Sequence, residues 1–215
     1  MQKIYFAIAS VFYVVIFWLR VFEFPEIAKF CIPAFVLMVA LYSFINAKDK
    51  SLKQGSLLLT LALAFAFCAD AVINFISVQI GVMVFFATHI CLVIYYLKKK
   101  PLERKEVLYI APLLAITIMF CMAVVPHTSD KLYIYGIPAY MVLLTVMLWR
   151  AVCLFNDKDN LKIILGSALF YLTDISVIMM LAYGDSTALN IEAWAMYPPA
   201  LFLLSLVGNK EHAKK

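Results

Sequence analysis

GSLLLTLALAFAFCADAVINF, residues 55–75, is apolar for the length of a membrane-spanning helix and carries one charged side chain, Asp70. A helical span needs about 20 mostly apolar residues. A carboxylate at membrane depth costs several kcal/mol and normally faces the interior of a helix bundle or a wet cavity. The stretch therefore predicts a membrane helix and, within it, a functional residue.

A second stretch, residues 161–183, repeats this pattern around Asp174, within the sequence Phe170-Tyr171-Leu172-Thr173-Asp174. Both aspartates fall in the central to outer part of helices predicted to run outward, four spans apart. This similarity indicates a weak parallel repeat of four plus four helices. It gives a geometric reason for two carboxylates to face each other at similar depth.

The composition of the whole chain is that of an integral membrane protein. Hydrophobic residues make up 66% of its 215 residues and charged residues only 14%, with a mean hydropathy of +0.96. A soluble domain needs more charge on its surface. We predict an all-α, polytopic fold, in which residues 1–215 form a single membrane domain with eight transmembrane helices, at about 4–22, 27–46, 55–75, 78–97, 107–125, 132–153, 161–183 and 191–208.

The basic residues predict the orientation of this bundle. With eight spans, fifteen of the eighteen Lys and Arg residues fall on the side of the two termini, and only Arg20, Lys29 and Lys131 fall on the other. The positive-inside rule then places both termini in the cytoplasm, and we expect a multi-pass protein of a bacterial inner membrane. The net charge of +5 is explained by this asymmetry and by contact with membrane lipids, so no nucleic-acid partner is expected.

Four further polar residues are candidate site residues. Lys29, near the outer interface, is either a snorkelling anchor or a contact for a lipid phosphate. Asn74 lies one turn beyond Asp70 on the same helix face. His89 is either a hydrogen-bonded packing residue or the group that orients one of the carboxylates. Tyr197 is either an interfacial belt residue or a hydrogen-bond partner of an aspartate.

Two carboxylates that share a low-dielectric site cannot both ionise cheaply, so one tends to hold a proton while the other stays ionised. Such a pair suits acid-assisted cleavage of acetal-like bonds. Peptide hydrolysis, proton-coupled transport and a purely structural role between helices remain alternatives. One histidine and two acids within the predicted spans provide few metal ligands, and the five cysteines show no CxxC spacing, so neither a metal nor another cofactor is expected.

Several short motifs together resemble the YhhN family of lysoplasmalogenases. They are Lys29 and Pro33 in the second span, Ala69-Asp70 in the third, His89 in the fourth, and Gly166-Ser167-Ala168-Leu169-Phe170 leading to Thr173-Asp174 in the seventh. The family usually has Gly-Asp and Ser-Asp at the two aspartates, so this chain departs from it at Ala69 and Thr173.

This resemblance implies hydrolysis of the vinyl ether bond of lysoplasmalogens carrying ethanolamine or choline, which yields a fatty aldehyde and a glycerophospho-alcohol. Asp70 and Asp174 would divide the acid and base roles. Lys29 would hold the phosphate of this lysophospholipid substrate, Asn74 would contact it, and His89 and Tyr197 would tune the pair. The sequence does not indicate which aspartate is the acid, nor an oligomeric state.

The main alternative is a small proton-coupled transporter that uses the same two aspartates. It shares the repeat, the buried acids and the proline-bearing helices. However, eight spans with short loops are few for alternating access, and six glycines provide few breaks in the helices. An intramembrane aspartyl protease is less favoured, because the expected Gly-x-Gly-Asp stretch is absent.

Overall fold

The computed structural model describes residues 2–47, 55–128, 130–155 and 160–207, without the side chains of residues 47, 55 and 56. These residues form eight α-helices and two short 3-10 helices and contain no strand. The elements, in chain order, are α1 (Gln2–Val21), α2 (Pro25–Ala47), α3 (Gly55–Phe75), α4 (Val78–Lys99), η1 (Arg104–Tyr109), α5 (Ile110–Val124), η2 (Val125–His127), α6 (Lys131–Val152), α7 (Leu161–Tyr183) and α8 (Thr187–Ser205).

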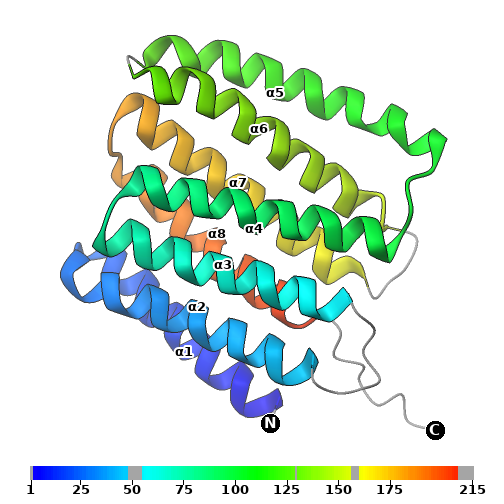
Figure 1. Ribbon diagram of the computed structural model, residues 1–215. Coiled ribbons are helices and arrows are strands. Elements are labelled where there is room, and N and C mark those ends of the chain that lie inside the picture. Colours follow the sequence, from blue (N-terminus) through cyan, green and yellow to red (C-terminus); the bar gives the residue numbers. More distant parts are fainter. Residues whose placement is uncertain (1, 48–54, 129, 156–159, 208–215) are drawn as a thin grey trace, which may run out of the picture.

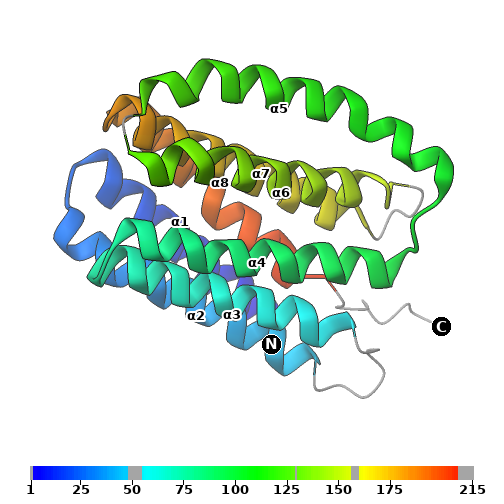
Figure 2. The same ribbon diagram turned by 45° about the horizontal axis from the view of Figure 1, so that its top comes forward.

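The helices lie side by side in one bundle, and consecutive helices run in opposite directions (Figure 1). The turns α1–α2, α3–α4, α5–α6 and α7–α8 therefore share one end, which we call the turn end; the start of α1 and the end of α8 lie at the other. Figure 2 shows α5 at the edge of the bundle, where it packs chiefly on α6. In contrast, α8 packs against α7, α1, α2 and α3.

Two glycines bring the helices that carry the predicted site residues close together. A Cβ atom on Gly81 of α4 would lie 2.2 Å from Ile73 Cγ1 and 3.0 Å from the Ala69 carbonyl oxygen, one residue before Asp70. A Cβ atom on Gly166 of α7 would lie 3.1 Å from the Ala200 carbonyl oxygen of α8. Small residues permit this backbone approach between membrane helices, so α3 is fixed against α4 and α7 against α8.

A buried ion-pair network ties the opposite end together. The Glu106 carboxylate in η1 pairs with Lys100 Nζ and, at 3.2 Å, with Arg150 Nη1 of α6. Arg150 also donates to the Lys100 carbonyl oxygen, and Trp149 Nε1 donates to the Glu106 carbonyl oxygen at 2.9 Å. Glu106 and Arg150 are only 3% and 0% exposed. The network anchors the segment between α4 and α5 onto α6.

The prediction of an all-helical chain is confirmed. Seven helical stretches of the described residues are long and apolar enough to cross a membrane by length and composition. They are α1, α2, α3, α4, α6, α7 and the stretch Arg104–His127, in which η1, α5 and η2 follow one another. This supports an integral multi-pass membrane protein. The eighth, α8, begins at Thr187 rather than near residue 191. Its first half carries Asn190 and Glu192 and its second half Pro198 and Pro199, so it is less apolar than the others, although it lies in the same bundle.

The predicted repeat and orientation stay predictions. At the turn end lie Arg20, Lys29 and Lys131, while the described basic residues of the other end include Lys98, Lys99 and Arg150. Seven of the lysines on which the predicted orientation depends lie outside the described residues, namely Lys48, Lys50, Lys53, Lys158, Lys210, Lys214 and Lys215.

Candidate active site

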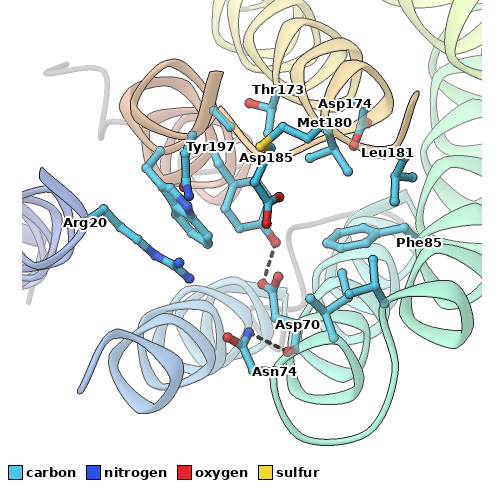
Figure 3. Close-up of a pocket in the computed structure, with 16 residues that line it drawn as sticks. Arg20, Asp70, Asn74, Phe85, Thr173, Asp174, Met180, Leu181, Asp185 and Tyr197 are labelled. Carbon is cyan, nitrogen blue, oxygen red and sulfur yellow. Dashed lines mark hydrogen bonds between the residues drawn. The ribbon is translucent and has the colours of Figure 1, made fainter. Parts of the chain in front are cut away.

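A cavity of about 360 Å³ lies between α1, α3, α4, α7 and α8 and reaches the turn between α7 and α8. We call it the aspartate cavity, because Asp70 and Asp174 both line it. Figure 3 shows the side chains that converge on it from these helices. Both aspartates are nearly inaccessible, 4% and 5% exposed. The structure therefore brings together the two carboxylates that the sequence singled out.

Asp70 is held by a phenol from α8. The Tyr197 hydroxyl donates a hydrogen bond of 2.5 Å to Asp70 Oδ2 (Figure 3). The close α7–α8 packing at Gly166 fixes the helix that carries this tyrosine. One turn further along α3, Asn74 Nδ2 donates to the Asp70 carbonyl oxygen at 2.8 Å. An oxygen that accepts a hydrogen bond from a phenol is favoured in its ionised form, so this setting suits a carboxylate.

Asp174 is held by an imidazole from α4. His89 Nε2 lies 3.0 Å from Asp174 Oδ2, and His89 is fully buried. His89 Nδ1 lies 2.8 Å from the Phe85 carbonyl oxygen. A backbone carbonyl can only accept, so Nδ1 carries a proton. The Tyr140 ring of α6 packs edge-on against the His89 ring, with 5.4 Å between the ring centroids, so side chains of both α4 and α6 surround the carboxyl group.

The protonation of the His89–Asp174 pair follows from this arrangement. With Nδ1 protonated, a neutral imidazole presents the lone pair of Nε2 to the carboxyl group. An ionised carboxylate 3.0 Å from that lone pair would be repelled. The pair is therefore favoured in a state that holds one shared proton, either as a carboxylic acid beside an imidazole or as a carboxylate beside an imidazolium. Nε2 and Oδ2 make no well-aligned hydrogen bond, either with each other or with other described residues.

An aromatic wall lies between the two aspartate environments. The Phe170 ring lies 4.8 Å from the His89 ring and 5.6 Å from the Tyr197 ring, between ring centroids, and Phe85 packs edge-on against both Phe170 and Tyr197. Aromatic pairs of this geometry pack specifically. Phe85 lines the aspartate cavity together with Asp70 and Asp174, so the wall gives the cavity an apolar surface beside the two carboxyl groups.

A scan against models of known protein families matches residues 30–207 to the YhhN family. The chain belongs to the YhhN family. The resemblance expected from the sequence is thereby confirmed. Comparisons with curated proteins and with solved structures found no match. The YhhN match includes Asp70, Asn74, His89, Asp174 and Tyr197, whereas α1 lies wholly outside it.

Lys29 lies at the predicted position, in the first turns of the second helix, but away from the aspartate cavity. Its Nζ forms an ion pair with Glu26 in the first turns of α2, and Lys29 is not among the described residues that line the aspartate cavity. Instead, the basic residue in the cavity is Arg20, near the end of α1. Figure 3 shows its guanidinium pointing into the cavity.

Sequence reasoning missed five of the polar or aromatic residues that line the aspartate cavity, namely Arg20, Phe85, Asp185, Asn190 and Trp194. The Arg20 guanidinium carbon lies 4.4 Å from the centre of the Trp194 ring, a cation–π arrangement. An available signal was the position of Arg20 within the last turn of an otherwise apolar helix. Among the described residues, no three His, Cys, Asp or Glu side chains come together as a metal site.

Proposed function

We propose that this chain is a lysoplasmalogenase-like hydrolase that cleaves the vinyl ether bond of lysoplasmalogens by acid–base catalysis at Asp70 and Asp174. The observation that carries this proposal is the pairing of two buried carboxylates in one cavity with different partners. One partner favours an ionised carboxylate and the other holds a proton. A vinyl ether needs both, because its hydrolysis starts with protonation of carbon and ends with addition of water.

We assign the acid role to the His89–Asp174 pair. Neither Nε2 nor Oδ2 makes a well-aligned hydrogen bond, with each other or with another described residue, so no hydrogen-bond network is broken when the proton is transferred. Buried polar groups are nearly always paired, and an exception calls for an explanation other than stability. Asp70, hydrogen-bonded by Tyr197, is the base, and its negative charge stabilises the cation that forms.

The reaction then proceeds in three steps. The pair protonates the vinyl carbon distant from the ether oxygen, which leaves an oxocarbenium ion on the other vinyl carbon and its oxygen. Asp70 takes a proton from a water molecule as the water oxygen bonds to the oxocarbenium carbon, giving a hemiacetal. The hemiacetal then breaks its bond to the glycerol oxygen, and its hydroxyl proton passes to that oxygen. The products are a fatty aldehyde and a glycerophospho-alcohol, and proton transfer from Asp70 back to the pair restores the site.

The cavity would be reached from the outer leaflet if the termini are cytoplasmic, because it reaches the turn end of the bundle. We propose this orientation on the positive-inside rule. It places the aspartates below the outer interface, where the vinyl ether of a lysolipid lies just beneath the headgroup.

The test is aldehyde release from lysoplasmenylethanolamine by the purified protein beside Asp70→Asn and Asp174→Asn. Losing a general acid or base lowers the rate about 10²- to 10⁴-fold, and we expect at least that loss in each variant. Asp130→Asn is the matched control. Asp130 caps α6 at an exposed position, where asparagine caps equally well.

Either active-site variant that folds normally and keeps its activity would contradict the mechanism. If the wild-type protein releases no aldehyde but exchanges a labelled solute in a counterflow assay in proteoliposomes, the transporter alternative is favoured instead.

A further inference from the structure

A second cavity adjoins the aspartate cavity at the turn end of the bundle. It has a volume of about 380 Å³ and shares three lining residues with the aspartate cavity: Arg20, Asp185 and Asn190. We call it the turn cavity, because its other lining residues lie in or beside the α1–α2 and α7–α8 turns and include Glu23, Ser186 and Thr187. The shared residues make the two cavities neighbouring parts of one site.

Arg20 stands where the two cavities meet. It makes no salt bridge with the described residues, since none of the ion pairs found among them includes it. Its Nε is buried without a hydrogen-bond partner, and the Trp194 ring fixes the guanidinium from one side. A guanidinium that is fixed in place and has unused N–H donors is suited to bind a planar or tetrahedral oxyanion, most commonly a phosphate.

Two carboxylates line the turn cavity beside this arginine. Glu23 and Asp185 are exposed and take part in none of the ion pairs of the described chain. Glu23 has a φ of 57°, the one positive φ among the described non-glycine residues. This left-handed residue ends α1, and the Phe24 N–H donates a hydrogen bond of 2.8 Å across it to the Leu19 carbonyl oxygen. This conformation places a carboxylate in the wall of the turn cavity.

We propose that Arg20, Glu23 and Asp185 form a headgroup subsite for a phosphate that carries a primary ammonium group. This proposal rests on the proposed function and refines its substrate class: the enzyme prefers ethanolamine over choline lysolipids. Arg20 binds the phosphate at the junction of the cavities, Glu23 and Asp185 bind the amine in the turn cavity, and the chain extends past Asp70 and Asp174.

The preference for a primary amine follows from the lining of the turn cavity. An ammonium group donates three hydrogen bonds, which carboxylates and hydroxyls such as those of Ser186 and Thr187 can accept. A quaternary ammonium donates none and is typically recognised by aromatic rings. None of the described residues that line the turn cavity is aromatic. Trp194, in the adjoining aspartate cavity, already has Arg20 over its ring.

The experiment measures binding, so that it does not depend on catalysis. Uncleavable 1-O-alkyl glycerophosphoethanolamine, its phosphocholine analogue and 1-O-alkylglycerol, all with one chain length, are titrated against the full-length protein in detergent. We expect the ethanolamine lipid to bind at least about tenfold more tightly than the choline lipid, the effect of one or more charge-assisted hydrogen bonds.

Two variants divide the subsite. Arg20→Gln is expected to weaken the binding of both phospholipids about tenfold and to leave the binding of 1-O-alkylglycerol unchanged. The double variant E23Q/D185N is expected to bind the ethanolamine lipid and the choline lipid with equal affinity. Glu26→Gln, which changes an exposed carboxylate in the next turn, is the matched control and should keep the wild-type preference. Thermal unfolding in the same detergent identifies variants that do not fold, and Arg20→Lys then replaces Arg20→Gln.

Equal binding of the two phospholipids by the wild-type protein would overturn the proposal, and so would a preference that survives in E23Q/D185N. This test separates the proposal from the catalytic one. Selective binding of the ethanolamine lipid without aldehyde release from the vinyl ether would support the headgroup subsite and contradict the hydrolase mechanism. Aldehyde release without a headgroup preference would support the hydrolase mechanism and contradict the headgroup subsite.

Discussion

Replacing Tyr197 by phenylalanine removes one hydroxyl group from the site and keeps the ring. The Tyr197 hydroxyl donates a 2.5 Å hydrogen bond to Asp70 Oδ2, while its ring packs against Phe85 and Phe170 at 6.1 and 5.6 Å between centroids. A hydrogen bond to a charged group contributes about 1.5–3 kcal/mol, which corresponds to roughly 10- to 150-fold in rate. We expect Tyr197→Phe to fold normally and to lose activity within that range.

The kinetic parameter that changes is part of the prediction. If the phenol acts by holding Asp70 as the base and as the charge that faces the oxocarbenium ion, kcat falls while KM stays near its wild-type value. The assay is steady-state aldehyde release from a vinyl ether lysolipid over a range of substrate concentrations. Tyr183→Phe is the control, since Tyr183 donates only to the Ala123 carbonyl oxygen at the edge of the bundle. A folded Tyr197→Phe variant with wild-type kcat, beside an inactive Asp70→Asn variant, would refute this role of the phenol.

Three other substitutions test separate parts of the structure. His89→Gln removes the imidazole that shares the proton of the acid and should lower kcat about 10²-fold or more, measured by aldehyde release; unchanged kcat would rule out His89 as part of the acid. Gly81→Ala places a Cβ atom 2.2 Å from Ile73 Cγ1 and should destabilise the fold by about 1–3 kcal/mol. Adding Ile73→Ala should restore part of the lost stability. Thermal unfolding in detergent measures the change, and an unchanged unfolding temperature would mean that the α3–α4 interface can relax. Arg150→Met leaves the buried Glu106 carboxylate with one basic partner, Lys100, instead of two and should cost up to about 3–5 kcal/mol. Lys29→Gln should change the free energy of unfolding by less than about 1 kcal/mol, and equal effects of the two substitutions would contradict the account of the buried network.

The parts of the site that could be predicted from sequence are those in which one residue contradicts its surroundings. Asp70 and Asp174 stand out because a carboxylate is costly within an apolar helix, and the structure places both on one cavity. The hydrogen bond from Tyr197 was one of two interpretations of that residue, and the approach of His89 to Asp174 was likewise one of two. Depth along a helix can be counted from sequence, but the direction in which a side chain points depends on how the helices pack.

The residues that the sequence did not single out were missed for the same reason. Lys29 and Arg20 were both placed near the outer interface, and the apolar pattern around them gave no reason to choose Arg20 for the cavity. The choice depends on the packing of α1 beside α8, which brings Arg20 over Trp194. The start of α8 was predicted too late, because its first turns, from Thr187 to Glu192, are not apolar. Such a helix is stabilised by its neighbours rather than by its own hydropathy.

If the proposed hydrolysis takes place here, the adjoining cavities would give its two products different routes out of the protein. On the proposed reaction, the scissile bond lies beside the aromatic wall, with the exposed turns on one side of it and the apolar interior of the bundle on the other. The amphiphile is thus cut close to the boundary between its water-soluble and oil-soluble parts. The glycerophospho-alcohol dissolves in the aqueous phase, while the aldehyde partitions into the bilayer. Because the products enter different solvents, they rarely meet again at the site, and this phase separation drives turnover forward without any input of energy.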